Sequence, residues 1–572
     1  MLYFLQMTTA ELIVKCLENY GVEYIFGIPG GALEPLNNAL YKSKIKVVVT
    51  KHEEGAAFMA DGYARLSGKI GVCFGTTGPG ATNLITGITS SHADSIPVLA
   101  LTAQVATAVF GKGAVQEFAG ESLSIVNMFR RITKYSDIII NERKAQDVIS
   151  KALRTALTGK TGPVHINLPT DIMKRETAER DSVNYIGQTM VFDREGVKRA
   201  ASILLKAKRP VILAGWGTVL SRADRELKEL AELMGIPVAT SQKGKGIFNE
   251  LHPLSLGVFG FAGSPAAREY IIEANNIDVM LAIGTSFNEW MTSSWDKRLR
   301  PKKSMIQVDI YPDEIGKNYP VAVGITGDAK VVLRELIYEL KRQSGKNKCE
   351  CSFEREVKKL KERFWTVAER RIIKSNRVPY KPQRLMKDLM DSLPADAIYF
   401  TDIGNNMAWA LRYINIVRPY SFYIPLGFAS MGFGVAAPIG AKLAMTDRPV
   451  VAIVGDGGFL MNGMEVSTAV NYNIPVIWVI MNNSMLGMIY HGLKLLSSPE
   501  GIPSKFKQVD FVKIAEGLGA RGIRITRPGE INKKMIDDII SSGAPTVLDV
   551  IIDPEEVPPI QSRVETLEKL YT

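Results

Sequence analysis

The sequence predicts an α/β protein whose domains each carry a parallel sheet flanked by helices. Short Val- and Ile-rich runs recur along the chain, as expected for strands buried on both faces of a parallel sheet. Amphipathic stretches such as 9–20 and 223–234 separate them and predict crossover helices. The 572 residues correspond to about three or four domains. The predicted strands lie at 47–49, 71–74, 98–102, 164–168, 210–214, 279–283, 450–454, 476–481 and 547–552.

Two shifts in composition divide the chain. Residues 174–184 are polar and charged without an apolar period, and residues 340–382 are highly charged and end in Val378-Pro-Tyr-Lys-Pro382. Such stretches are typical of linkers between domains. We therefore expect domains at 7–175, 190–340 and 380–555. The first and third blocks are similar in size and class, and the letters show no short internal repeat.

The composition excludes several classes of protein. With 46% apolar and 23% charged residues, the chain is neither disordered nor fibrous. No apolar run reaches the roughly 18 residues that a membrane helix needs, and the opening MLYFLQM is too short for a secretory signal, so we expect a cytoplasmic protein. The net charge of +11 is spread along the chain with Glu among the Lys and Arg. Neither a nucleic acid nor a membrane is therefore an expected partner.

The four cysteines indicate no structural cross-link. Cys16 and Cys73 lie in apolar segments and are predicted to be core thiols. Cys349 and Cys351 form a lone pair in a charged stretch, without the second pair that a zinc site needs. The count excludes a disulfide framework, in keeping with a reducing compartment.

The strongest chemical signal is a pair of polar residues at the ends of two predicted strands. Strand 450–454 runs into Gly455-Asp456-Gly457-Gly458, and strand 476–481 ends at Asn482-Asn483. The spacing of Asp456 and Asn483 (483 − 456 = 27) fits a strand, a crossover helix and a second parallel strand, so both side chains are expected at one carboxyl edge. Their oxygens suit Mg²⁺ together with phosphate oxygens, and the glycines allow a diphosphate to approach. The alternative is a plain glycine turn.

A carboxylate follows another predicted strand. Glu53 stands in Lys51-His52-Glu53-Glu54-Gly55, just after strand 47–49 and at the start of an Ala- and Gly-rich helix. Two interpretations are open: the helix macrodipole favours an exposed carboxylate there, or the carboxylate is buried and shares a proton with a heterocyclic nitrogen. His52 beside it and His491, beyond Asn483, are candidates to line the same site.

Two glycine-rich turns complete the set of motifs. Thr76-Thr77-Gly78-Pro79-Gly80 follows strand 71–74 and leads into a helix, which leaves room for a flat ligand. Gly427-Phe-Ala-Ser-Met431-Gly-Phe-Gly434 surrounds one bulky side chain with small residues, so Met431 is expected to project from a tight backbone. Taken singly, the first motif is also consistent with a structural turn, and Met431 with a core residue.

Together the four motifs resemble the thiamine diphosphate-dependent decarboxylases and carboligases, and among them the acetohydroxyacid (acetolactate) synthases. The resemblance extends from Gly27-Ile-Pro-Gly-Gly31 to Pro554-Glu-Glu-Val-Pro558. It implies two thiamine diphosphate-binding domains flanking a Rossmann-like central domain. Family members bind the cofactor between the first domain of one subunit and the third domain of another, which implies a homodimer or homotetramer. A regulatory subunit is a further candidate partner.

The resemblance also implies roles for individual residues. Glu53 matches the glutamate that hydrogen-bonds the pyrimidine ring of the cofactor, Gln116 matches an active-site glutamine, and Met431 matches the residue that wedges the cofactor into a V shape. The implied Mg²⁺ ligands are Asp456, Asn483 and the carbonyl of Met485. The implied cofactor contacts are Gly31, Thr77, Gly404, Asn405, Asn406, Gly427, Met431, Gly455, Gly457, Gly458 and Met485.

The implied activity is decarboxylation of a 2-oxo acid, pyruvate, followed by carboligation to a second 2-oxo acid. A 2-oxo acid decarboxylase, a pyruvate oxidase and a 2-hydroxyacyl-CoA lyase share the scaffold and are the alternatives. Two rivals come from other classes: a cofactor-binding protein without catalysis and a basic nucleic-acid-binding protein. The intact Glu53, Asp456 and Asn483 argue against the first, and the mixed charges argue against the second.

Several segments depart from the synthases, among them Thr170 in place of a lysine and Val115 in place of the phenylalanine before Gln116. Their Gly-Val-Arg-Phe-Asp-Asp-Arg reads Gly284-Thr-Ser-Phe-Asn-Glu-Trp290 here, so Ser286 and Trp290 replace arginines, one of them expected near the acceptor carboxylate. A tryptophan that screens acceptor size in synthases aligns with Gly492. Loop 257–263 resembles a flavin-contacting loop with Ala262 in place of a histidine. FAD, ADP, coenzyme A or no ligand therefore remain candidates for the central domain.

Overall fold

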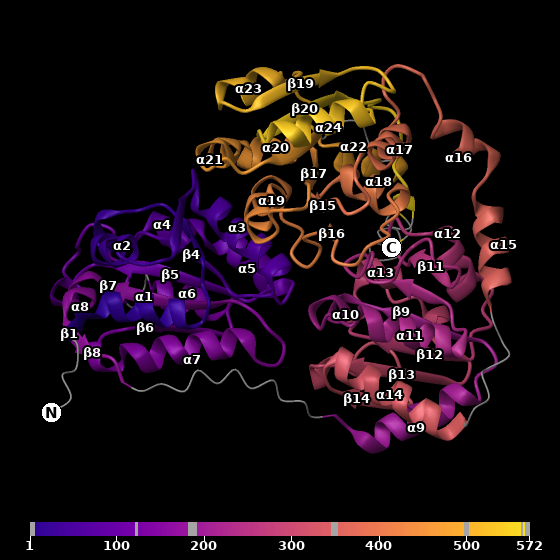
Figure 1. Cartoon of the computed structure of the whole chain (residues 1–572), viewed down its shortest axis with the longest axis horizontal. Coiled ribbons are helices and arrows are strands. Elements are labelled where there is room, and N and C mark those ends of the chain that lie inside the picture. The colour runs from indigo at the N-terminus through magenta and orange to yellow at the C-terminus, as the bar shows by residue number, and fades with distance from the viewer. Residues whose placement is uncertain are drawn as a thin grey trace.

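A computed structural model describes residues 6–120, 124–180, 192–344, 353–496 and 503–561, with 564 and 566. Within these residues it shows three six-stranded sheets covered by helices (Figure 1). The N-terminal sheet lies within residues 24–169, the central sheet within 210–326 and the C-terminal sheet within 398–551. The predicted α/β class is confirmed, and the domain limits 7–175, 190–340 and 380–555 stay predictions.

The N-terminal sheet is parallel, with the strand order β3-β2-β4-β5-β7-β6. A short antiparallel pair, β1 (Gln6–Thr8) and β8 (Glu176–Ala178), joins the two ends of this domain. The strands are β2 (Tyr24–Gly27), β3 (Lys46–Val49), β4 (Gly71–Gly75), β5 (Val98–Gln104), β6 (Tyr135–Ile138) and β7 (Val164–Pro169). The helices are α1 (Thr9–Asn19), α2 (Glu34–Tyr41), α3 (Glu53–Ser67), α4 (Pro79–Asn83), α5 (Ile85–Ala93), α6 (Ile125–Arg130), α7 (Ala145–Leu157) and α8 (Thr170–Lys174).

The C-terminal sheet is also parallel and has the order β16-β15-β17-β18-β20-β19. When the strands of each sheet are numbered from one, this order and that of the N-terminal sheet are the same, 2-1-3-4-6-5. The strands are β15 (Ile398–Thr401), β16 (Phe422–Tyr423), β17 (Val450–Gly455), β18 (Val476–Asn482), β19 (Arg521–Ile525) and β20 (Thr546–Ile551). The helices are α17 (Pro382–Ser392), α18 (Asn405–Tyr413), α19 (Phe433–Ala444), α20 (Asp456–Asn462), α21 (Val466–Asn471), α22 (Gly487–Leu495), α23 (Phe511–Gly517) and α24 (Lys533–Ser542).

The central sheet has the order β11-β10-β9-β12-β13-β14. Numbered from one this is 3-2-1-4-5-6, the order of a doubly wound nucleotide-binding sheet. The strands are β9 (Pro210–Ala214), β10 (Val238–Thr240), β11 (Ser255–Val258), β12 (Val279–Ile283), β13 (Ser304–Asp309) and β14 (Val323–Thr326). The helices are α9 (Arg194–Leu205), α10 (Trp216–Leu220), α11 (Asp224–Met234), α12 (Pro265–Arg268), α13 (Glu289–Thr292) and α14 (Ala329–Ser344).

The two composition shifts coincide only in part with linkers. Strand β8 lies inside 174–184 and pairs with β1. This pairing is long-range and leaves no local pattern, so the sequence did not predict the strand, and the boundary there stays a prediction. The charged stretch contains α15 (Glu354–Phe364) and α16 (Val367–Ile372). Cys349 and Cys351 lie outside the described residues, whereas Cys16 and Cys73 are buried free thiols, as predicted.

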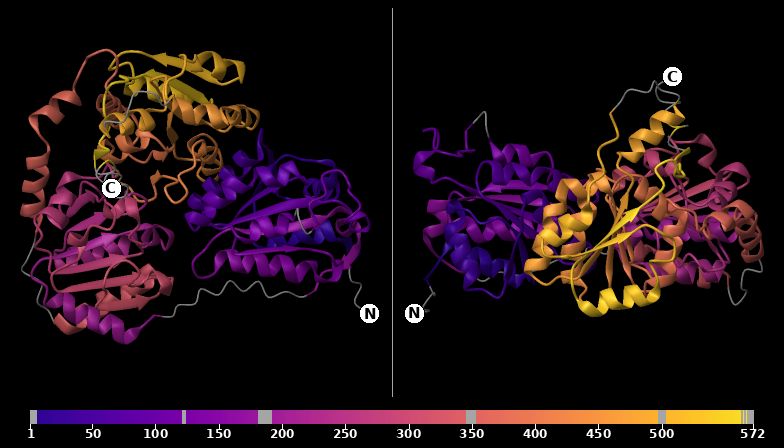
Figure 2. Two further views of the ribbon diagram at one scale, coloured as in Figure 1. Left: turned by 180° about the vertical axis from the view of Figure 1, so that it is seen from behind. Right: turned by 90° about the horizontal axis from the view of Figure 1, so that it is seen from above.

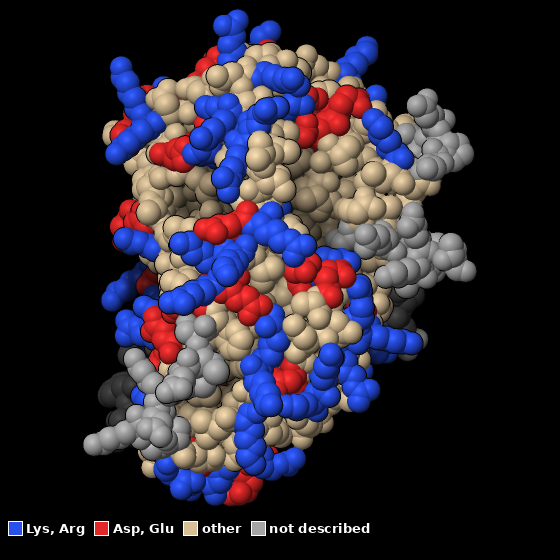
Figure 3. All heavy atoms as spheres, turned by 90° about the vertical axis from the view of Figure 1, so that its right-hand side faces the viewer, with Lys and Arg blue, Asp and Glu red and all other residues tan. Residues whose placement is uncertain are grey.

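Helices α15 and α16 run along one side of the molecule from the central domain to the C-terminal domain (Figure 1). Arg363 of α15 pairs with Glu269 at 3.6 Å, and Glu369 of α16 pairs with Arg412 at 2.7 Å. On this side Lys and Arg predominate, and groups of Asp and Glu lie among them (Figure 3). The surface is therefore a solvated face of mixed charge, without the uniform basic stripe of a nucleic-acid-binding protein. In the described part of the chain, no helix is long and apolar enough to span a membrane.

The N-terminal and C-terminal domains meet where α3 packs against α19 (Figures 1 and 2). A side chain at Gly62 would place its Cβ 2.0 Å from the carbonyl oxygen of Ala437, and one at Gly440 would come within 1.9 Å of that of Met59. Only glycine allows two backbones to approach so closely. The contact fixes the start of α3 relative to the C-terminal domain.

A buried charge cluster joins all three domains. Asp94 accepts hydrogen bonds from the guanidinium of Arg65 at 2.8 Å, from Nζ of Lys243 in the central domain at 2.8 Å, and from the backbone N–H of Gly427 in the C-terminal domain at 3.0 Å. Arg65 also pairs with Asp61, and the side chains of Asp61, Arg65 and Asp94 are completely buried. Their charges are thus compensated by one another and not by water.

Replacing Arg65 with Leu is expected to destabilise the protein by about 3–5 kcal/mol, because two buried carboxylates lose their shared cation. The matched control is Arg521→Leu, which removes a surface pair with Asp538 and should cost at most about 1 kcal/mol. Denaturant titration of the two variants measures the difference. Equal unfolding midpoints would contradict the structural role given to the cluster.

Candidate active site

A pocket of about 180 Å³ opens at the carboxyl edge of the C-terminal sheet. Three strand ends meet there: β15 leads to Gly404, β17 to Asp456 and β18 to Asn483. Parallel strands deliver their following residues to the same edge, which is why residues far apart in sequence share this pocket. Of the predicted site residues, its lining contains Gly404, Asn405, Asn406, Met431, Gly455, Asp456, Gly457, Gly458, Asn483 and Met485.

Asp456 is the charged centre of this pocket. Its side chain is 1% exposed. Oδ2 accepts hydrogen bonds from the backbone N–H groups of Asn483 at 3.0 Å and Ser484 at 2.6 Å, and Oδ1 accepts one from Gly457 at 2.8 Å. Burial raises the pKa of Asp456 to about 6 although these N–H groups act in the opposite direction. The carboxylate therefore ties the two loops together and lacks a compensating cation among the described side chains.

The loop that carries Met431 is held by an acid that sequence reasoning missed. Asp402 is completely buried and accepts hydrogen bonds from the backbone N–H groups of Gly432 at 3.0 Å and Gly434 at 3.2 Å. Burial raises the pKa of Asp402 to about 6. Met431 lies over Gly457, with its methyl 3.7 Å from the place that a Cβ of Gly457 would take. Asp402 comes directly after β15, just as Asp456 comes directly after β17. This position after a buried strand is the one feature of the sequence that could have identified Asp402.

Glu53 begins helix α3, as predicted, and is 6% exposed. His52 caps this helix, because its Nδ1 accepts a hydrogen bond from the N–H of Glu54 at 3.1 Å. The carboxylate of Glu53 accepts a hydrogen bond from the amide of Asn83 at 3.0 Å, and its other oxygen lies 3.1 Å from the place that a Cβ of Gly80 would take. Of the two interpretations, the buried carboxylate holds, and Asn83 is a partner that sequence reasoning missed.

The other predicted residues of the first domain gather around the same turn. The hydroxyl of Thr77 donates to the carbonyl of Gln116 at 2.7 Å, and Gln116 itself adopts a left-handed φ of 62°. Its neighbour Val115 is 87% exposed. Gly31 begins a short 3₁₀ turn with no atom within 4 Å of a would-be Cβ. The structure thus brings Thr77 and Gln116 together and leaves Gly31 in open space.

Within one chain, the pocket residues of the C-terminal domain and the predicted site residues of the N-terminal domain belong to separate sites. Every lining residue of the pocket comes from residues 382–556. The start of α3 does touch the C-terminal domain, but through other residues: Glu465 accepts hydrogen bonds from the N–H groups of Lys51 and His52, and Glu54 accepts one from Asn462. Gly427 also lies outside the pocket and binds Asp94. The side chain of Glu53 is hydrogen-bonded within its own domain, to Asn83.

Family models cover all three domains. Residues 7–123 match the N-terminal TPP binding domain, residues 197–336 the central domain and residues 402–550 the C-terminal TPP binding domain of thiamine pyrophosphate enzymes. The chain belongs to this family. The two TPP-binding domains are those that share one strand order, and they flank the Rossmann-like domain as the resemblance implied.

Full-length relatives of this thiamine pyrophosphate enzyme carry one activity in their names. A probable acetolactate synthase large subunit of Methanocaldococcus jannaschii is 41% identical, with 97% of this chain and 93% of the relative covered. One of Methanococcus aeolicus is 39% identical over 97% and 94%. The isozyme 3 large subunit of Escherichia coli acetolactate synthase is 32% identical over 99% and 98%.

The residues of the pocket suit a diphosphate bound through a divalent cation. The described residues contain no cluster of three or more His, Cys, Asp or Glu side chains that would hold a metal alone. Asp456 is the single carboxylate of the implied ligand set, so a Mg²⁺ held there would need further oxygen ligands, which the phosphates of the cofactor would supply. A buried carboxylate without a cationic partner and the buried side-chain oxygen of Asn405, which has no hydrogen-bond partner, both fit a cation.

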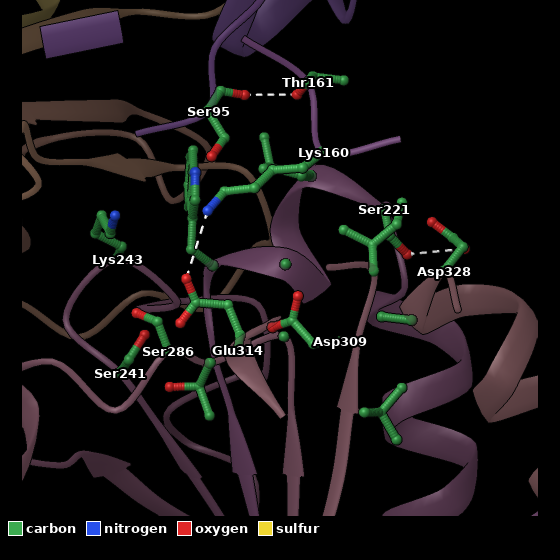
Figure 4. Close-up of a pocket in the computed structure, with 18 of the residues that line it drawn as sticks. Ser95, Lys160, Thr161, Ser221, Ser241, Lys243, Ser286, Asp309, Glu314 and Asp328 are labelled. Carbon is green, nitrogen blue, oxygen red and sulfur yellow. Dashed lines mark hydrogen bonds and ion pairs between the residues drawn. The ribbon is translucent and has the colours of Figure 1, made fainter. Parts of the chain in front are cut away.

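A second, larger cavity of about 820 Å³ opens at the carboxyl edge of the central sheet (Figure 4). It lies where the strand order reverses between β9 and β12, the place where doubly wound sheets bind nucleotides. Gly217 and Gly284 meet there so closely that a Cβ on Gly217 would come within 2.6 Å of the Cα of Gly284. From the N-terminal domain, Lys160 reaches across the cavity to Glu314 at 3.6 Å. Asp309 and Asp328 stand at the ends of β13 and β14.

Ser286 and Trp290, which stand where synthases carry arginines, lie in different surroundings. Ser286 lines the large cavity. Trp290 packs edge-on against Phe261, with ring centroids 4.4 Å apart, beside the apolar core of the C-terminal domain. An aromatic residue in apolar surroundings cannot form the two parallel hydrogen bonds that an arginine makes with a carboxylate.

Proposed function

We propose that this thiamine pyrophosphate enzyme decarboxylates a 2-oxo acid, pyruvate, and joins the product to a second 2-oxo acid in the manner of an acetolactate synthase catalytic subunit. The observation that carries the proposal is the near full-length similarity to acetolactate synthase large subunits together with Glu53 and Asp456 at the carboxyl edges of the two TPP-binding domains. Mg²⁺ and thiamine diphosphate are the proposed cofactors.

The proposed roles of the residues are those that the family resemblance implies, and the surroundings of each residue support them. Thiamine diphosphate, when bound, supplies the electron sink for decarboxylation. Asp456, Asn483 and the carbonyl of Met485 hold the divalent cation at the diphosphate. Met431 packs against the cofactor from the loop that Asp402 fixes. Glu53, desolvated and oriented by Asn83, holds and returns a proton at the pyrimidine ring, which is work for a carboxylate in a dry site.

We further propose a homodimer or homotetramer in which Glu53 of one subunit meets the pocket of another. Two features support this proposal. The pocket has no lining residue from its own N-terminal domain among the described residues, and apolar side chains stand exposed on α20 and the turn after it, namely Leu460, Met461 and Met464. Exposed apolar clusters of this kind are typical of subunit interfaces. Since the relatives are named large subunits, a regulatory subunit is a proposed partner. A cytoplasmic location stays a prediction.

The large cavity is proposed to hold an adenine-containing cofactor. Its position at the topological switch point, its paired glycines and its two strand-end acids support a nucleotide, since such acids accept hydrogen bonds from ribose hydroxyls. FAD is the first candidate, with ADP and coenzyme A as alternatives. Visible absorbance of the purified protein distinguishes a flavin from the other two.

Product analysis tests the proposed reaction. With pyruvate as the only substrate, the purified protein supplied with Mg²⁺ and thiamine diphosphate is expected to form acetolactate. Acetaldehyde as the main product would instead indicate a decarboxylase, and acetate or acetyl phosphate an oxidase. Because Trp290 stands where synthases carry an arginine, 2-oxobutyrate should be offered as a competing acceptor in the same assay.

A further inference from the structure

His491 stands between the cofactor pocket and the segment that follows β20. It lies on α22 and is 1% exposed. Its Nε2 is 3.0 Å from the carbonyl oxygen of Pro554, and its Nδ1 is 2.8 Å from the side-chain nitrogen of Asn405. Asn405 lines the pocket. His491 therefore touches the wall of the pocket from behind, and its two ring nitrogens have different partners.

The hydrogen-bond partner of Nε2 determines which ring nitrogen of His491 carries the proton. A carbonyl oxygen can only accept a hydrogen bond, so Nε2 carries a proton and donates to Pro554. Burial lowers the pKa of His491, in keeping with a neutral ring that has one proton. Nδ1 is then a bare acceptor, and it takes a hydrogen bond from the amide N–H of Asn405.

The ring in turn decides which way the amide of Asn405 faces. Since the NH₂ group of Asn405 is directed at Nδ1, its Oδ1 is the free end, and this oxygen is buried without a hydrogen-bond partner. The amide nitrogens of Asn405 and Asn483 lie 2.7 and 3.2 Å from the place that a Cβ of Gly487 would take. The amide of Asn405 is therefore a neighbour of the amide of Asn483, one of the implied Mg²⁺ ligands, in the wall of the pocket that both residues line.

An oxygen acceptor in this place has limited chemistry. It cannot donate to a phosphate oxygen, whereas it can accept from a water on a cation or bind the cation itself. The neighbouring Asn406 offers no free N–H either, because its amide donates to the carbonyls of Asp402 and Ile453. Of this Gly-Asn-Asn segment, only the backbone N–H groups at the start of α18 are then left to face a diphosphate.

We propose that His491 is a positioning residue that holds Asn405 as an acceptor on the cation side of the cofactor pocket, in place of the diphosphate contact expected from the sequence. The proposal rests on the proposed binding of thiamine diphosphate with Mg²⁺. It assigns His491 no contact with substrate.

Calorimetric titration of thiamine diphosphate at several Mg²⁺ concentrations tests it. His491→Gln keeps an acceptor for Asn405 and a donor for Pro554, and should bind within about twofold of the wild type, whereas His491→Leu should need about tenfold more Mg²⁺, the usual cost of removing a residue that orients a ligand. The control His252→Leu, which removes a surface histidine beside Glu232, should behave as the wild type. Equal binding by the Gln and Leu variants would overturn the proposal.

Asn405→Asp provides a test that does not depend on the stability of the Leu variant. A carboxylate accepts and cannot donate, so it needs a proton on Nδ1 of His491 in place of the N–H of Asn405. With that proton present, this variant should bind at equal or lower Mg²⁺ if Asn405 serves the cation. A loss of tenfold or more (about 1.4 kcal/mol), measured below as well as above neutral pH, would overturn the proposal. If the wild type itself shows no Mg²⁺-dependent binding of thiamine diphosphate, the proposed function is refuted. That result is distinct from a failure of the role given to His491, which shows only in the comparison of variants.

Discussion

Glu53→Gln is expected to lower turnover by a factor on the order of 10²–10⁴, the usual contribution of a group that transfers a proton, while thiamine diphosphate binds almost as before. The amide has nearly the shape of the carboxylate, so the hydrogen bond with Asn83 can be replaced by one of the opposite direction. It cannot take up a proton, however. Steady-state kinetics at saturating cofactor and calorimetry of cofactor binding measure the two effects separately.

The neighbouring acid is the matched control for this variant. Glu54→Gln changes a carboxylate one residue further along α3 that hydrogen-bonds Asn462 of its own chain and takes no part in the proposed chemistry. It should keep turnover within about threefold of the wild type, as expected when no transition-state contact is lost. Near wild-type turnover of Glu53→Gln, or equal losses in the two variants, would refute the role given to Glu53.

Asp456→Ala should abolish the Mg²⁺-dependent binding of thiamine diphosphate. The change removes the only carboxylate of the implied ligand set and also the acceptor that ties Gly457, Asn483 and Ser484 together. Since a cation held by one protein carboxylate depends strongly on it, no uptake is expected at Mg²⁺ concentrations that saturate the wild type. Calorimetry or quenching of protein fluorescence reports binding.

Asp456→Asn separates loss of charge from loss of loop structure. The amide oxygen can still accept from the N–H groups of Asn483 and Ser484, and only the hydrogen bond from Gly457 is lost. This variant should therefore unfold at a higher temperature than Asp456→Ala and still bind poorly. The control is Asp510→Ala, which removes an ordinary surface acid. Asp510 caps helix α23 and lies next to β19. Uptake by Asp456→Asn at low Mg²⁺ equal to that of the wild type would count against the metal assignment.

Local patterns predicted the most apolar strands and the strand ends that carry chemistry, but they missed other strands of the three sheets, such as β2, β13 and β15. Strand β9 covers the predicted 210–214 and β12 the predicted 279–283, because buried parallel strands are continuous apolar runs. The placement of Asp456 and Asn483 in one pocket followed from the topology rule for parallel strands alone. Glu53 at the first position of α3 followed from the change of period after strand 47–49.

What the sequence could not predict depends on contacts between distant segments. Asp402, Asn83 and His491 act on site residues through tertiary hydrogen bonds. The sequence placed His491 near the site and Asp402 after a strand, but it did not reveal which residues these side chains contact. Strand β8 exists because it pairs with β1. The shared strand order of the outer domains is likewise invisible in the letters, since topology is preserved by packing and not by identity of residues.

The central claim is that an acid from one subunit and a cation site from another meet on one cofactor. Mixing the two inactive variants, Glu53→Gln and Asp456→Ala, and letting the subunits exchange tests this directly. If the site is shared between chains, each mixed dimer contains one site with both wild-type residues.

Activity of the mixture should then recover to about a quarter of the wild type, because half of the dimers are mixed and half of their sites are intact. If Glu53 and Asp456 of one chain served the same site, every site in the mixed dimer would carry one defect. A mixture as inactive as the two parent variants, despite proven subunit exchange, would contradict the account.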